Sequence, residues 1–257
     1  MTITMSYRHS AYFPVMFKWI FFLAFPWLGY SQADSIYSEV TGKGEITIIF
    51  ESGMAGTHDE WDSYIDSLKG SFTLFTYDRA GIGQSLPTDA PRSIPQMVEE
   101  LRSELSERGL SPPYLLVGHS MGSYVSRYFT DSYPEEVVGL VLIDPSPDRL
   151  YDEYTDEEME DFISFGDEAM SESPEGDVAE WDAYLSNRAY VRGLAAPDTI
   201  PVIILSATQW DFWEYHEDYL NEHPESVHLQ MEATHAIHKE RALDIIPLLI
   251  ELGNKQL

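Results

Sequence analysis

Short apolar runs alternate with stretches of helical pattern along most of this chain. Runs bounded by glycine or polar residues are typical of buried strands, whereas apolar residues three and four apart indicate helices. The predicted strands are 46–50, 72–76, 114–117, 137–143, 202–205 and 226–230, with a weaker one at 36–40. The predicted helices are 93–108, 120–132 and 241–252. Because strands that alternate with helices form βαβ units, we expect an α/β fold with a mostly parallel sheet covered on both faces.

The composition excludes several classes of partner and site. The 257 residues suffice for one α/β domain with a sizeable core. Acidic residues number 44 against 15 Lys and Arg, which gives a formal net charge of −29. A surface of this sign repels nucleic acid and anionic membranes, so we expect neither as a partner. The chain has no cysteine, which excludes disulfides, a cysteine nucleophile and a cysteine-ligated metal.

The N-terminus has the layout of a signal peptide. Lys18 precedes an apolar run at 19–28, and small residues follow the run, the last being Ser31. The run is too short to span a bilayer comfortably, so we expect cleavage after Ser31 and export of a domain spanning 32–257. The exported protein then has no membrane span and acts in the periplasm or outside the cell.

Two alternatives remain for this region. An uncleaved N-terminal anchor would use the same apolar run. Met16 lies directly before the basic residue that precedes that run. Translation that starts at Met16 would give a more typical signal peptide than translation from Met1, so residues 1–15 can be the result of a start codon assigned too far upstream.

Residues 148–198 interrupt the alternation of strands and helices. This segment has no strand pattern and holds 16 acidic residues against three basic ones. Its aromatic residues at loosely helical spacing are Phe162, Phe165, Trp181, Tyr184 and Tyr190. The segment is either a helical excursion whose aromatic face only packs, or a lid over the carboxyl ends of the strands, where open α/β sheets bind ligands. Because it lies between two predicted sheet strands, we expect an acidic helical lid.

The most specific motif is Gly-His-Ser-Met-Gly at 118–122. It directly follows the strand at 114–117 and directly precedes a helix. G-x-S-x-G in this setting is a nucleophile elbow: the tight turn exposes the serine, the glycines allow close approach, and the helix N-terminus stabilises negative charge. The alternative is an ordinary glycine-rich turn. We predict that Ser120 is a nucleophile.

A serine nucleophile needs a general base, for which His235 is the best candidate. His235 lies between the last predicted strand and the last helix, where a loop can reach back over Ser120. His238 is the competing candidate, and His119 is expected to pack behind the sheet. A zinc site from His235 and His238 is disfavoured, because the chain has no H-E-x-x-H and no third ligand at a telling spacing. We therefore expect no metal.

These motifs, with two others, resemble the α/β-hydrolase superfamily, in particular its small lid-bearing branch of esterase, lipase-like and haloperoxidase-like members. Residues 48–56 resemble the oxyanion loop after the third strand of that fold. Residues 77–85, Tyr-Asp-Arg-Ala-Gly-Ile-Gly-Gln-Ser, resemble its D-R-x-G-x-G-x-S turn after the fourth strand. Two features depart from the pattern. Ser52 stands where the oxyanion loop usually has histidine, and the loop after 202–205 lacks the usual G-x-x-D spacing.

The resemblance implies an oxyanion hole made by the backbone N–H groups of Met54 and Met121. Both donors are main-chain groups, so Ser52 in place of histidine need not harm them. The resemblance also implies that Asp78 and Arg79 form a buried pair that braces loops near the site.

The third member of a catalytic triad must be a carboxylate that hydrogen-bonds the far nitrogen of His235. Asp211 lies in the usual loop, after the strand 202–205, but stands later than the usual spacing. Asp144 lies at the carboxyl tip of the strand 137–143. A structural carboxylate at Asp144 and a helix N-cap at Asp211 are the alternatives. We predict Asp144 from its position at a strand tip, with Asp211 as the alternative acid.

The expected function is a secreted serine hydrolase that cleaves carboxylic esters through an acyl-enzyme, without a cofactor. The aromatic lid favours a small-molecule ester with an apolar group. Peptidases, lactonases and cofactor-free haloperoxidases use the same scaffold, and a non-catalytic ligand-binding protein is the competing class.

Overall fold

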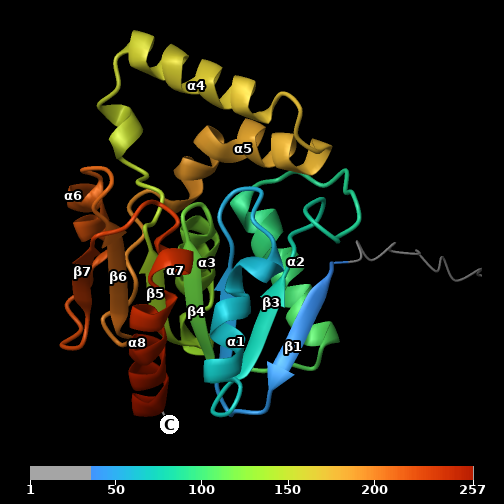
Figure 1. Ribbon diagram of the computed structural model, residues 1–257, viewed down its shortest axis with the longest axis vertical. Coiled ribbons are helices and arrows are strands. Elements are labelled where there is room, and N and C mark those ends of the chain that lie inside the picture. The colour runs from blue at the N-terminus through green and yellow to red at the C-terminus, as the bar shows by residue number, and fades with distance from the viewer. Residues whose placement is uncertain (1–35, 257) are drawn as a thin grey trace, which may run out of the picture. The chain divides into compact units, whose positions relative to one another are not determined.

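A seven-stranded sheet runs through residues 36–256, the part of the chain that the structure, a computed structural model, describes (Figure 1). Its strands are β1 (Ser38–Gly42), β2 (Thr47–Glu51), β3 (Thr73–Tyr77), β4 (Tyr114–His119), β5 (Val137–Ile143), β6 (Val202–Ala207) and β7 (Val227–Met231). They lie in the order β1-β3-β2-β4-β5-β6-β7, with β1 antiparallel to β3 and every other pair parallel. The predicted α/β class with a mostly parallel sheet is confirmed.

The strands lie within two residues of their predicted positions because their apolar runs are buried on both faces. All side chains of β2, β3, β4 and β6 are buried. Parallel strands covered by helices on both sides read as continuous apolar runs rather than alternating ones. The predicted weak strand at 36–40 is β1, an edge strand whose side chains are mostly exposed or half-buried.

Helices cover the two faces of the sheet in two groups. One apolar core joins the sheet to α2 (Ile94–Glu107) and α3 (Gly122–Ser132). The other core joins it to α1 (Asp62–Leu68) and α8 (Ala242–Lys255). The remaining short helices are η1 (His58–Trp61), η2 (Pro134–Glu136), η3 (Leu150–Asp152), α6 (Trp213–His216), η4 (Glu217–Tyr219) and α7 (Ile237–Glu240).

The segment 148–198 forms two longer helices, α4 (Asp156–Met170) and α5 (Glu175–Val191). Helix α4 begins at a capping box: the Thr155 hydroxyl accepts the N–H of Glu158, and the Glu158 carboxylate accepts the N–H of Thr155. Helix α5 packs on α2 and α3, whereas α4 packs on α5, at the top of Figure 1. The segment is therefore layered, with α5 against the core and α4 outside it.

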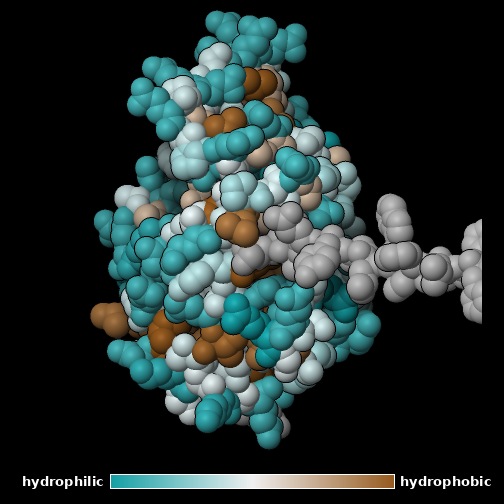
Figure 2. All heavy atoms as spheres, turned by 90° about the vertical axis from the view of Figure 1, so that its right-hand side faces the viewer, coloured by the Kyte–Doolittle hydropathy of each residue, from teal (hydrophilic) through white to brown (hydrophobic). Residues whose placement is uncertain are grey.

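The expected aromatic face of this segment is only partly formed. Tyr184 is buried, and Phe162 and Trp181 are half-buried against the core of α2 and α3. Phe165 and Tyr190, by contrast, are 73% and 44% exposed. Helix α4 is covered from one side only, so its other directions face water, and Figure 2 shows mainly hydrophilic atoms over this upper part of the molecule.

The predicted signal peptide, residues 1–31, lies outside the described residues, which belong to one compact unit, Asp34–Leu257. Among residues 36–256, no helix combines the length and apolar character needed to cross a bilayer.

Candidate active site

Ser120 occupies a strained turn between β4 and α3. Its φ of 51° lies in the left-handed region, which non-glycine residues rarely adopt outside functional sites. A Cβ on Gly118 would lie 2.6 Å from the Ser126 Oγ, and one on Gly122 would lie 2.5 Å from the Glu51 carbonyl oxygen. Only glycine fits at these two positions, which is the physical reason for the G-x-S-x-G spacing.

The structure brings Ser120, His235 and Asp144 together. The Ser120 Oγ lies 2.9 Å from the His235 Nε2, and the His235 Nδ1 lies 2.5 Å from the Asp144 Oδ2. An Nδ1–H donated to the carboxylate leaves the Nε2 lone pair facing the serine hydroxyl. Ser120 is half-buried and the His235 side chain is 35% exposed, so solvent and ligands can reach both.

Backbone contacts hold the carboxylate and the imidazole in place. The Asp144 Oδ1 accepts the N–H of Ala207 at 3.0 Å, which joins the tip of β5 to the end of β6. Asp144 itself has a φ of 40°, a second left-handed residue at this edge of the sheet. The N–H of His235 donates to the Gln209 Oε1 at 2.8 Å. Ser120, Asp144 and His235 therefore lie at the carboxyl ends of β4 and β5 and on the loop after β7.

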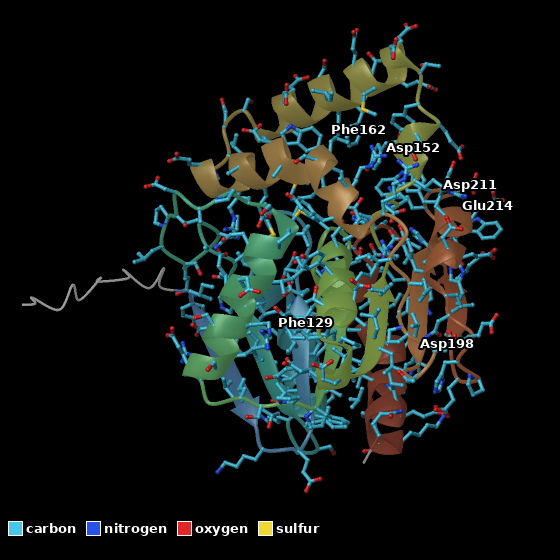
Figure 3. All side chains as sticks on the ribbon, turned by 180° about the vertical axis from the view of Figure 1, so that it is seen from behind. Phe129, Asp152, Phe162, Asp198, Asp211 and Glu214 are labelled. Carbon is cyan, nitrogen blue, oxygen red and sulfur yellow. The ribbon has the colours of Figure 1, made fainter. Side chains whose placement is uncertain are left out.

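The alternative acid, Asp211, does not reach His235. It is exposed, and within residues 36–256 no hydrogen bond or ion pair joins it to the imidazole. Figure 3 labels Asp211 beside Glu214, at the segment that carries α6. Trp210 lies nearer, with its ring centroid 5.4 Å from that of His235. Of the two predicted acids, the structure brings Asp144 to the histidine.

The predicted oxyanion donors lie on the two segments that meet at Ser120. Met121 follows the serine, and Met54 lies in the loop after β2. A Cβ on Gly53 would lie 3.3 Å from the Ser120 Cβ, so this loop runs directly against the serine. In the described part of the chain, no hydrogen bond uses the N–H of Met54 or of Met121.

His119 and His238 support the site from behind. The His119 Nε2 donates to the His235 carbonyl oxygen at 2.8 Å, and the rings of His119 and His238 lie 3.9 Å apart between centroids, tilted by 35°. Burial lowers the pKa of His119 well below its ordinary range and lowers that of His238 to about 3. Both are neutral near pH 7, and neither contacts the Ser120 hydroxyl.

One group of side chains has potential ligand atoms close enough together to bind one metal ion. The donor atoms of Glu60, His119 and His238 lie within 4.8 Å of one another, and this is the one such group in the described residues. The Lys239 ammonium lies 2.7 Å from the Glu60 carboxylate, where its charge repels a cation. His235 cannot join His238 on a zinc ion without leaving its partners, since Ser120 and Asp144 occupy its two nitrogens.

Asp78 and Arg79 are both buried and brace loops near Ser120, as the resemblance implies, but each has its own partners rather than the other. Asp78 accepts the backbone N–H groups of His58 and Gln84. Arg79 pairs instead with Glu180 of α5, at 2.6 Å between Nε and Oε1. Neighbouring side chains at the end of β3 point in opposite directions, so each residue finds its own partner.

Sequence reasoning missed Glu180, because it lies in a segment rich in acidic residues. A signal was nevertheless present. Glu180, Tyr184, Asn187 and Val191 are the buried residues of α5, and their spacing of four, three and four defines one helix face. A glutamate and an asparagine on the same face as apolar residues indicate buried polar partners.

The sequence model of the alpha/beta hydrolase fold family matches residues 46–187. Among curated relatives, the Bacillus subtilis (strain 168) protein YqjL is 37% identical over 105 residues, which cover 41% of this chain and 42% of that protein. The (lyso)-N-acylphosphatidylethanolamine lipase of Mus musculus is 30% identical over 107 residues, which cover 40% of this chain and 31% of the lipase. The chain thus spans less than half the length of these curated relatives.

Solved structures agree in fold. A marine microorganism esterase superposes with a TM-score of 0.62 at 18% identity, covering 85% of this chain and 99% of the esterase. Mouse alpha/beta hydrolase domain-containing protein 10 gives a TM-score of 0.65 at 21% identity, covering 90% and 98%. At these identities the likeness shows the fold alone. Since the family match covers more than half of the chain and the sheet has the matching architecture, the chain belongs to the alpha/beta hydrolase family.

Proposed function

We propose that this protein is a serine hydrolase that cleaves carboxylic esters, with Ser120 as nucleophile, His235 as general base and Asp144 as the acid of the triad. The observation that carries the proposal is the unbroken chain of hydrogen bonds from the Ser120 Oγ through His235 to Asp144, at 2.9 and 2.5 Å. Nucleophile, base and orienting carboxylate within hydrogen-bond reach are the geometric signature of nucleophilic catalysis.

The mechanism follows from these positions. His235 takes the proton of Ser120 through Nε2 as Oγ attacks the ester carbonyl. The oxyanion accepts the N–H groups of Met54 and Met121, and the imidazolium is stabilised by Asp144. His235 then returns the proton to the leaving alcohol, and a water activated by the same imidazole hydrolyses the acyl-enzyme. The residues present suffice for this sequence without a cofactor.

Three observations favour a small ester with an apolar group. Trp210 lies beside His235, Met54 packs on the apolar core next to the site, and Phe162 of α4 and Trp181 of α5 pack on that same core. Two of the similar structures are described as esterases, and three mammalian curated relatives are described as lipases. We propose that the enzyme acts after export, as the sequence at 1–31 predicts.

Labelling with a fluorophosphonate tests the enzyme class. We expect wild-type protein to be labelled on Ser120 and Ser120→Ala to remain unlabelled, because the probe reacts only with an activated serine. Folded wild-type protein that takes no label at Ser120 would show a non-catalytic binder. A panel of acyl esters, lactones, peptides and a halogenation assay then separates the esterase from the other activities of this scaffold, and the highest kcat/KM decides among them.

A further inference from the structure

The loop that carries Met54 is held from outside its own strand. Arg79 donates to the Ser52 carbonyl oxygen at 2.8 Å and to the Gly53 carbonyl oxygen at 2.6 Å. The N–H of Ala55, one residue past Met54, donates to the Glu180 Oε2 at 2.9 Å. Ala55 has a φ of 55°, a left-handed conformation that needs such support in a residue other than glycine.

These contacts fix the direction of the predicted oxyanion donor. The Gly53 carbonyl and the Met54 N–H belong to one planar trans peptide, so the two groups point in opposite directions. When Arg79 holds the carbonyl on one side, the N–H of Met54 must point to the other. The next peptide, between Met54 and Ala55, is held at its N–H by Glu180. Arg79 and Glu180 therefore contact both peptide planes that flank Met54, and the N–H of Gly56 also donates to the Gly53 carbonyl oxygen, at 3.1 Å.

Glu180 is the member of this pair that comes from α5. It is completely buried and binds Arg79 through two contacts, Nε to Oε1 at 2.6 Å and Nη2 to Oε2 at 2.9 Å. The other carboxylate near Arg79, that of Glu51, lies 3.6 Å from Nη1, which is too long for a hydrogen bond. Glu180 is thus the carboxylate that hydrogen-bonds Arg79, which also donates to the Ser52 and Gly53 carbonyl oxygens.

Helix α5 also lies so close to the turn after β3 that Gly176 has no room for a side chain. A Cβ on Gly176 would lie 2.0 Å from the Gly81 carbonyl oxygen. Farther along the helix, Asn187 accepts the N–H of Ile94 and donates to the Arg92 carbonyl oxygen. Gly176, Glu180 and Asn187 therefore fix the position of α5 on the rest of the domain. Of these three residues, Glu180 is the one that contacts the oxyanion loop.

We propose that Glu180 is a positioning residue: its side chain reaches from α5 to the oxyanion loop and orients the N–H of Met54. The oxyanion hole is then complete only when α5 is packed in its observed position. The inference rests on the proposed esterase function. It assigns to the inner helix of segment 148–198 a part in transition-state stabilisation, in addition to any part in covering the substrate.

Glu180→Gln tests this assignment, with Asp182→Asn as the matched control at an exposed position on the same helix. A Gln oxygen in the place of Oε2 can still accept from Ala55 and from the Arg79 Nη2, but the Gln NH2 group then faces the Arg79 Nε–H, so that contact and the carboxylate charge are lost. With 4-nitrophenyl butyrate, we expect kcat to fall about 10- to 100-fold with KM changed less than about twofold, since one misdirected oxyanion donor acts on the transition state alone. Affinity for phenylboronic acid, whose tetrahedral adduct uses the same hole, should fall in parallel.

Hydrogen exchange and a second variant separate a positioning role of Glu180 from a purely structural one. Hydrogen exchange of the amides at 53–55 should speed up in Glu180→Gln and stay unchanged in Asp182→Asn. If Glu180→Gln is not recovered folded, Gly176→Ala displaces α5 without touching the oxyanion loop and should show the same loss of kcat. A folded Glu180→Gln with a lower melting temperature but wild-type kcat and boronate affinity overturns the proposal. Wild-type protein with neither turnover nor Ser120 labelling overturns the proposed function itself, and this inference with it.

Discussion

Asp144 is unusual as a carboxylate at a strand tip, because its backbone is left-handed and its two oxygens have different partners. One oxygen faces the His235 Nδ1 and the other accepts the N–H of Ala207. Asn tolerates the left-handed region better than most residues and can keep an acceptor toward Ala207. Asp144→Asn is therefore a change that removes the charge with little disturbance of the backbone.

We expect Asp144→Asn to lower kcat for a 4-nitrophenyl ester by about 10⁴, because the wrong imidazole tautomer then faces Ser120. An Asp-to-Asn change in the serine-protease triad has an effect of this size. Asp211→Asn, the matched control, should retain near wild-type kcat. The melting temperatures of both variants show that the fold persists. Near-full activity of Asp144→Asn combined with loss in Asp211→Asn would reverse the assignment of the acid.

Glu51 makes the stability of the protein depend on pH. Its side chain is fully buried under the site, where the Tyr77 hydroxyl donates to one oxygen. Burial raises the pKa of Glu51 from 4.5 to about 7, although the Arg79 charge opposes the shift. Between these two pH values the folded chain keeps a proton that the unfolded chain releases, so stability falls as the pH rises toward 7.

Glu51→Gln should remove this dependence. A shift of this size corresponds to roughly 3 kcal/mol at 1.36 kcal/mol per pKa unit. We expect the free energy of unfolding of Glu51→Gln to rise relative to that of wild type, by up to that amount, between pH 4.5 and pH 8, as measured by urea denaturation. The buried histidines are common to both proteins and cancel in the difference. A difference that stays constant with pH would show that Glu51 is ionised in the fold throughout.

At the scale of elements, α4 and α5 have different tasks. Phe162 of α4 contacts Tyr151, Trp181 and Tyr184, and Figure 3 shows it between the two helices. Polar contacts to the core come from α5 instead, through Glu180 and Asn187. Removing the whole segment 148–198 would leave the Arg79 charge buried without its partner, which is strongly destabilising.

Replacing α4 alone with a short Gly-Ser linker should therefore change specificity while sparing the chemistry. We expect the ratio of kcat/KM for long-chain to short-chain 4-nitrophenyl esters to shift, while the rate of fluorophosphonate labelling at Ser120 stays within about threefold of wild type. Unaltered chain-length preference in a folded variant would mean that α4 only packs. Loss of labelling would mean that α4, and not just α5, supports the oxyanion hole.

The sequence predicts the sheet better than the helices of segment 148–198, for a physical reason. Strands such as β5 are buried on both faces, so their apolar runs mark them whatever their neighbours. Which residues of α5 are buried depends on partners that are distant in the chain. Glu180, for example, is buried because Arg79 lies opposite it. Likewise, a strand tip made Asp144 a candidate, but only the folded distance to His235 separates it from Asp211.

At the scale of the whole molecule, the proposed cleavage of residues 1–31 changes the net charge. The formal net charge is −29 over all 257 residues, and residues 1–31 contain Arg8 and Lys18 but no acid. Removing them leaves 13 basic and 44 acidic residues, a net charge of −31. So acidic a surface would repel anionic membranes and nucleic acid, which agrees with the small uncharged ester proposed as substrate.

Protein isolated from its native host should begin near Gln32. Gly29 and Ser31 place small residues three and one positions before that site, directly after the apolar run, as signal peptidase requires. Mass spectrometry of the intact protein and of its N-terminal peptide gives the position. Ser31→Trp, which puts a bulky residue at the cleavage position, should yield a longer, membrane-retained form with Ser120 still labelled by fluorophosphonate. A wild-type protein that starts at Met1 or Met16 would contradict cleavage and favour the uncleaved anchor, in which the run at 19–28 stays in the lipid.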